Sequence, residues 1–168
     1  MATKNKLSEA ELVKHSLLAV TLLATLSYTA TVSARTVDAQ EEVRKVFTTW
    51  STALTRGDKK SYLDAFWNSP RLVIRVAGGE WRGFDAYRTR IEGAQLPPGN
   101  PSDYRNVEVV MLGTEAAVVT YERPAPQQAN AAAGEAQIFR GTLVFTRTAS
   151  GWKIAAWHAH SVAASSAH

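Results

Sequence analysis

The chain has 168 residues, of which 45% are hydrophobic and 20% charged, a size and composition typical of one folded domain and not of a disordered or fibrous protein. Its net charge of +4 is too small to indicate nucleic-acid binding. The chain contains no cysteine, which excludes disulfides, thiol nucleophiles, iron–sulfur clusters and cysteine-ligated zinc.

Residues 1–34 have the pattern of a secretory signal peptide. Three lysines precede an uncharged stretch that runs from His15 to Ala34, and Val32-Ser33-Ala34 has the small-residue spacing that signal peptidase cleaves. We therefore expect cleavage near Ala34 and a periplasmic or secreted product, with residues 35–168 forming a single domain. The alternative is an uncleaved N-terminal membrane anchor, because about twenty uncharged residues just span a bilayer.

Three helices are expected before the main strands. Asp38 and Glu41 have the spacing of a capping box, and apolar residues then recur at helical intervals until Gly57. Asp58 is placed to cap a second, shorter helix, and a third helix is predicted over residues 84–91.

From Arg105 onward the apolar period changes from that of a helix to that of a strand. Following a first strand at residues 72–76, four further strands are predicted, at residues 107–112, 116–122, 138–148 and 152–162. Residues 124–134 are rich in alanine and glutamine and are expected to form an exposed, mobile hairpin loop. This order predicts an α+β layout with helices on one face of a curved antiparallel sheet.

Several short motifs occur in a characteristic order. They are Phe47-x-x-Trp50-x-x-Ala53, Ala65-Phe66-Trp67, Gly79-Glu80-x-Arg82-Gly83, Leu112-Gly113-x-Glu115-Ala116 and Gly151-Trp152-Lys153-Ile154. With these motifs the chain resembles the nuclear transport factor 2-like (NTF2-like) superfamily, most closely its SnoaL-like members of the DUF4440 or calmodulin-kinase-association-domain type.

The resemblance implies an NTF2-like cone, in which three N-terminal helices pack on a strongly bent antiparallel sheet around an apolar pocket. It also implies that a homodimer forms through the outer face of the sheet. Members of the superfamily catalyse isomerisation, cyclisation, dehydration or epoxide hydrolysis, or only bind a ligand, so the fold alone does not decide the function.

Strand alternation predicts which side chains face the pocket. In the 138–148 strand the inward set is Phe139, Gly141, Leu143 and Phe145, and the outward set is Arg140, Thr142, Val144 and Thr146. The same rule points Tyr121 inward. Strict alternation from Trp152 through Ile154 and Ala156 also points His158 inward.

His158 and Tyr121 are therefore the candidate catalytic residues, since an imidazole in a pocket can act as a general base near neutral pH. The alternative is a structural histidine that only hydrogen-bonds a tyrosine or the backbone. No inward strand position carries a carboxylate, so isomerase chemistry lacks its base. His158 and His160 lack a third metal ligand, and neither a metal nor a cofactor is expected.

The candidate ligand-binding residues are Trp50, Tyr62, Phe66, Arg75, Tyr87 and His158. The aromatic members either form the core or line a cavity for an apolar molecule. Arg75 either holds an anion at the pocket mouth or is simply exposed.

The leading hypothesis is an exported domain that binds a small hydrophobic molecule without clear catalytic machinery. One alternative is a lyase, isomerase or hydrolase that uses His158 and Tyr121. Another is a dimeric assembly or partner-docking module with Trp157 as an exposed anchor on the outer sheet face. A homodimer is expected, and neither nucleic acid nor a membrane is an expected partner after signal cleavage.

Overall fold

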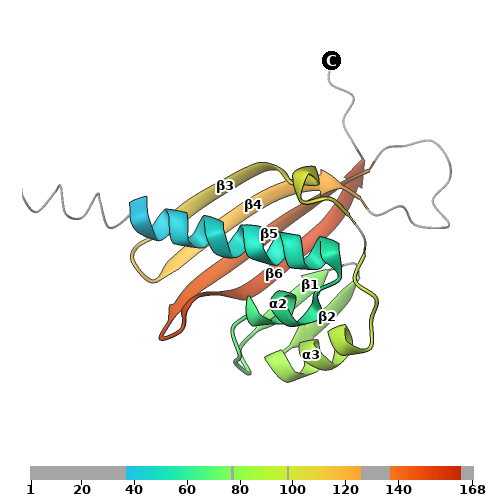
Figure 1. Ribbon diagram of the computed structural model, residues 1–168, viewed down its shortest axis with the longest axis horizontal. Coiled ribbons are helices and arrows are strands. Elements are labelled where there is room, and N and C mark those ends of the chain that lie inside the picture. Colours follow the sequence, from blue (N-terminus) through green and yellow to red (C-terminus); the bar gives the residue numbers. More distant parts are fainter. Residues whose placement is uncertain (1–36, 77, 98, 126–136, 164–168) are drawn as a thin grey trace, which may run out of the picture. The chain divides into compact units, whose positions relative to one another are not determined.

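The computed structural model describes residues 37–76, 78–97, 99–125 and 137–163 (Figure 1). The chain divides into two units at Asp38, and the following description concerns the second, from Ala39 onward. The proposed leader at residues 1–34 and most of the expected loop at 124–134 lie outside the described residues. Among the helices of the described part, none is long and apolar enough to cross a membrane.

The helices follow the sequence prediction closely. The first helix covers residues 37–56, α2 covers Lys59–Asp64, α3 covers Phe84–Glu92, and a 3₁₀ turn, η1, covers Pro101–Asp103. The six strands are β1 (Val73–Val76), β2 (Gly79–Arg82), β3 (Arg105–Leu112), β4 (Ala116–Pro124), β5 (Gln137–Thr148) and β6 (Gly151–Ala163).

The strands form one curled sheet in the order β2-β1-β6-β5-β4-β3, which confirms the α+β prediction. Two details of the prediction are wrong. The pair β1–β6 is parallel, because the chain passes through four other strands and α3 before β6 returns beside β1. The segment expected to be only a turn at Gly78-Gly79 continues into the strand β2.

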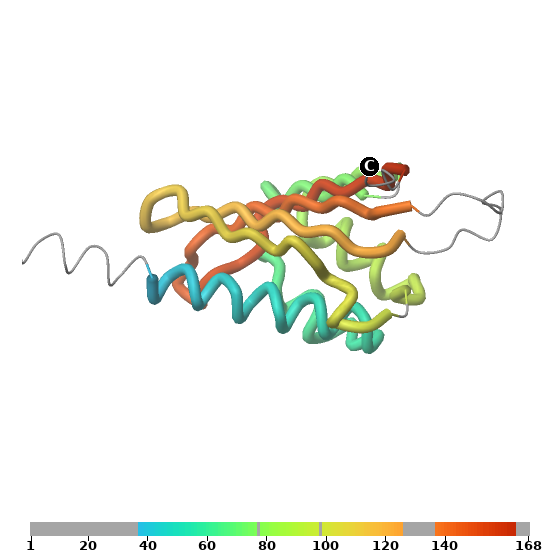
Figure 2. The backbone as a smooth tube through the Cα atoms, turned by 90° about the horizontal axis from the view of Figure 1, so that it is seen from above, coloured from blue at the N-terminus to red at the C-terminus, as the bar shows by residue number. Residues whose placement is uncertain are grey.

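The helices lie along one face of the sheet, as Figure 2 shows for the first helix and α2. Trp152 Nε1 donates to Glu42 of the first helix over 2.9 Å, and Gln40 of that helix donates to the carbonyl of Val109 over 3.1 Å. These two contacts attach the helix to opposite halves of the sheet.

The connection between the first two helices is encoded locally. Gly57 takes the left-handed backbone conformation, with φ of +72°, that commonly ends a helix. Asp58 caps α2 as predicted and accepts a hydrogen bond from the Ser61 amide over 3.0 Å. Hydrogen bonding by the Ser61 side chain and backbone lowers the pKa of Asp58. Asp38, in contrast, lies inside the first helix and does not cap it.

A β-bulge in β6 changes which side chains face the helices. Val144 pairs with Ala156 whereas Phe145 pairs with Ile154, so Ala155 is an extra residue with no partner on β5. At Ile154 the backbone of β6 bonds the segment after α2, and from Ala156 onward its neighbour is β1. The alternation of β6 therefore reverses between Ile154 and Trp157.

The space between the helices and the sheet is filled by aromatic rings around Trp50, which is fully buried. The rings within 6.1 Å of Trp50, measured between centroids, belong to Phe47, Tyr62, Tyr104, Tyr121 and Trp157. Such a cluster contributes large apolar burial, so most of the aromatic set serves the core.

Candidate ligand pocket

A pocket of about 490 Å³ opens where α3, the β1–β2 turn, the end of β4, the start of β5 and the middle of β6 meet. Its walls are mainly apolar and aromatic; they include Leu54, Tyr62, Trp81, Tyr87, Ile91, Leu96, Phe139 and Trp157. This volume and lining are those of small-molecule sites in proteins.

Arg123, near the end of β4, lines the same pocket and is the most unusual residue in it. Only 8% of its surface is exposed, and its Nε has no hydrogen-bond partner in the described part of the chain. The guanidinium carbon lies 5.2 Å from the centre of the Phe139 ring and 5.7 Å from that of Tyr104. The aromatic faces only partly replace the hydration that this charge has lost.

A second cation, Arg90 on α3, lies at the exposed rim, 5.9 Å from the centre of the Trp81 ring. None of the residues that line the pocket in the described part of the chain is an aspartate or a glutamate. The described lining therefore carries two positive charges and none of the carboxylates that ketosteroid-isomerase chemistry uses as a base.

The two pocket tyrosines predicted from the sequence, Tyr62 and Tyr87, do line the cavity, and their hydroxyl groups hydrogen-bond each other. Burial raises the pKa of both phenols well above the usual value. Both side chains are therefore neutral near pH 7 and do not supply a base.

The prediction that His158 faces the pocket is wrong. Because of the bulge at Ala155, His158 and His160 lie on the outer face of the sheet and are exposed, whereas Trp157 is buried at 6% exposure. The prediction of Trp157 as an exposed dimer anchor is wrong for the same reason.

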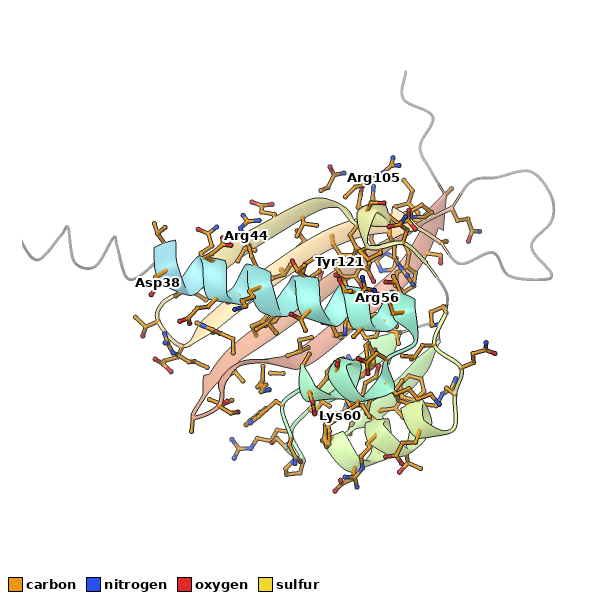
Figure 3. All side chains as sticks on the ribbon, in the orientation of Figure 1. Asp38, Arg44, Arg56, Lys60, Arg105 and Tyr121 are labelled. Carbon is orange, nitrogen blue, oxygen red and sulfur yellow. The ribbon has the colours of Figure 1, made fainter. Side chains whose placement is uncertain are left out.

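Tyr121 faces inward as predicted, and Figure 3 labels it on the sheet beside the first helix. Its hydroxyl accepts a hydrogen bond from Trp157 Nε1 over 2.9 Å, and burial raises the pKa of Tyr121 well above the usual value. Tyr121 does not line the pocket and lies on the opposite side of the sheet from His158. The His158–Tyr121 catalytic pair is thus not assembled.

Three other predicted ligand contacts lie elsewhere. Trp50 is buried within the core, and Phe66 borders a different groove. Arg75 is exposed on the outer face and forms an ion pair with Glu80 over 2.9 Å. None of the three lines the pocket.

Sequence reasoning missed Arg123 although the signal was available. The inward set of β4 continues from Tyr121 to Arg123 by simple alternation, but the predicted strand ended one residue earlier. Arg90 carried no comparable signal, because it reaches the pocket through the packing of α3.

A larger groove of about 780 Å³ runs between α2, α3 and the β5–β6 turn, but its charged groups already have partners. Lys60 pairs with Asp64 over 2.8 Å, Lys59 donates to the carbonyl of Glu92, and Lys153 donates to that of Asp64. These groups are exposed to solvent, so the groove is a weaker candidate than the pocket around Arg123. The described residues also contain no cluster of three side chains suited to hold a metal ion.

The family follows from the comparison with family models. Residues 43–165 match the model of the SnoaL-like domain, and the chain belongs to this family. A search of curated proteins gives no match.

Solved structures share the fold. A cystatin-like fold protein from Burkholderia xenovorans is 25% identical, with a TM-score of 0.63 and coverage of 76% of this chain and 94% of that one. An NTF2-like superfamily protein from Salmonella enterica serovar Typhimurium is 16% identical, with a TM-score of 0.58 and coverage of 77% and 95%. A ketosteroid isomerase-like protein from Erwinia carotovora atroseptica is 12% identical, with a TM-score of 0.58 and coverage of 73% and 95%.

Proposed function

We propose that this domain is a binding protein for a small, mostly apolar molecule, which it holds in the pocket between α3 and strands β4, β5 and β6. The observation that carries the proposal is the pocket of about 490 Å³ with aromatic walls. The separation of His158 from Tyr121, together with the absence of a carboxylate from the described lining, favours binding over catalysis.

The test is the binding of N-phenylnaphthylamine, a neutral probe whose fluorescence rises in apolar surroundings. The purified protein is expected to bind it, and Ala94→Trp is expected to abolish binding because Ala94 lines the pocket. The matched control is Ala86→Trp, which adds the same side chain at an exposed position of α3 outside the pocket. Equal probe binding in both variants contradicts the proposal.

The proposed location is outside the cytoplasm, supported by the lysine-flanked uncharged stretch that ends at Val32-Ser33-Ala34. The periplasmic or secreted protein is expected to begin near Arg35 by intact mass. A cytoplasmic product that retains residues 1–34 contradicts export, and a membrane-bound product of full length supports the anchor alternative.

A further inference from the structure

We infer that the ligand of this pocket carries a carboxylate, which Arg123 binds at the inner wall while the apolar body of the ligand packs against the aromatic residues. This inference rests on the proposed function and narrows it to the class of aryl or alkyl carboxylates.

The first step is the cost of burying Arg123. An arginine stays protonated at any pH that the protein experiences, so its positive charge is present in the folded state. Arg123 as a whole is 8% exposed, and burying a charged side chain is unfavourable unless an opposite charge or hydrogen-bond acceptors compensate it. In the described part of the chain, Arg123 forms no ion pair with a carboxylate.

The second step is the position of the Arg123 guanidinium relative to the pocket. Arg123 belongs to the pocket lining, and its Nε–H donor is buried and has no hydrogen-bond partner among the described residues. Arg140, an arginine on the outer face of the neighbouring strand β5, differs from Arg123 because it forms an ion pair with Glu122 over 2.7 Å. Within the part of the chain that the structure describes, the inward Arg123 thus lacks the acidic partner that the outward Arg140 has.

The third step is the match with ligand chemistry. A carboxylate accepts two parallel N–H bonds from a guanidinium, and such charge-assisted bonds are stronger than neutral ones. The Phe139 and Tyr104 rings flank the guanidinium and restrict its position, which reduces the entropy lost on binding. Arg90 at the rim adds positive potential that favours the entry of an anion.

The fourth step concerns the rest of the ligand. Away from Arg123 the walls are Leu54, Val76, Ile91, Leu96 and Trp157, which offer apolar surface and few polar groups. A charged group placed against this apolar surface would lose its hydration without gaining a partner there. This favours a molecule with an apolar body and an acidic group that reaches Arg123 over a sugar or a polyphosphate.

The experiment compares naphthoate with naphthamide, two molecules of the same shape that differ in the charge of one group. Both are titrated into the purified protein by calorimetry, and both compete with N-phenylnaphthylamine. We expect naphthoate to bind about tenfold or more tightly than naphthamide, since a hydrogen-bonded charge is worth that factor or more. Arg123→Met is expected to abolish the preference and leave the Kd of the neutral probe within about threefold.

Arg123→Lys is the second variant, because it keeps the charge and removes the planar fork. It is expected to keep part of the preference for naphthoate, which tests the inference even if Arg123→Met fails to fold. The rim control is Arg90→Met, whose effect on the naphthoate preference is expected to be smaller than that of Arg123→Met.

The outcomes separate the inference from the function on which it rests. If the neutral probe binds but the wild-type protein does not prefer naphthoate, or if the preference survives in Arg123→Met, the inference is overturned and the apolar pocket stands. If neither the neutral probe nor naphthamide binds, the proposed function is overturned. Loss of the preference in Arg123→Met alone, with the neutral probe still bound, supports both.

Discussion

At the scale of single residues, Gly141 shows how tightly the inner face of the sheet is packed. A Cβ at this position would lie 2.1 Å from Cζ of Tyr121, so only glycine leaves room for the tyrosine ring. That ring cannot easily move, because Trp157 bonds its hydroxyl and Phe47 and Trp50 pack beside it. Gly141 therefore makes room for Tyr121 in the core.

We expect Gly141→Ala to lower the free energy of unfolding by about 1–3 kcal/mol, the usual cost of overpacking. Urea denaturation followed by circular dichroism measures the change. Gly93→Ala is the control, because Gly93 has an ordinary φ of −82° and its nearest neighbour would be 3.7 Å away. The cost of Gly141→Ala is expected to shrink in a Tyr121→Ala background, and a fully additive pair contradicts this account.

At the scale of elements, the bulge in β6 determines which face of the sheet each residue after Ala155 lies on. The bulge lets Trp152 and Ile154 face the first helix and α2, and then lets Trp157 and Ala159 face inward beside β1. One extra residue thus moves a tryptophan into the core and two histidines into solvent.

We therefore expect substitutions at the neighbouring positions Trp157 and His158 to differ widely in their effect on the free energy of unfolding. Trp157→Ala should cost about 3–5 kcal/mol of unfolding free energy, because it removes a buried ring. His158→Ala should change it by no more than about 0.5 kcal/mol, as at most exposed sites. Chemical denaturation of the two variants measures both values, and a similar cost for both would contradict the reversal of β6 at Ala155.

The sequence was sufficient for the fold and for most of the inner face, because periodicity identified the first helix, α2, α3 and the inward set of β5. The prediction of the inner face failed in β6, where the bulge at Ala155 interrupts the alternation of inward and outward residues. Trp157 was itself the missed signal, since a large apolar residue out of phase with Trp152 and Ile154 implies a reversal between them. The pocket was harder to predict, because its walls come from segments that only tertiary packing brings together.

At the scale of the whole described domain, the core contains four buried or half-buried tyrosines. The pKa of each of these phenols is raised. Burial raises the pKa of Tyr104 to about 12, against the effect of the nearby Arg123 charge. Burial also raises the pKa of Tyr62, Tyr87 and Tyr121 well above the usual value. Each folded-state pKa lies above that of an unfolded tyrosine, which is about 10.

Alkaline unfolding is expected as a consequence. Because the folded state holds the phenol protons more tightly, the stability they contribute is complete below about pH 10 and is lost as the pH rises above that value. Near-ultraviolet absorbance of tyrosinate and circular dichroism should therefore change together. Ionisation of these four tyrosines near pH 10 with the fold intact would contradict the burial of their hydroxyl groups.

The outer face of the sheet carries a continuous apolar row, which is relevant to the proposed homodimer. Register pairs Val110 with Val118, Val118 with Val144, Val144 with Ala156, and Ala156 with Val73. Val110 remains 45% exposed, and no helix covers this face in the part of the chain that the structure describes (Figure 2). A second copy of the chain would bury this row and remove the exposed apolar surface from water.

We propose that the dimer forms through this row and not through Trp157. Light scattering of the purified protein is expected to give twice the chain mass, and Val118→Lys at the centre of the row is expected to give the monomer, because a buried interface does not tolerate an unpaired charge. Thr48→Lys places the same charge on an exposed turn of the first helix and should leave the dimer intact. A wild-type monomer at high protein concentration contradicts the dimer, and a dimer that survives Val118→Lys shows that it uses another surface.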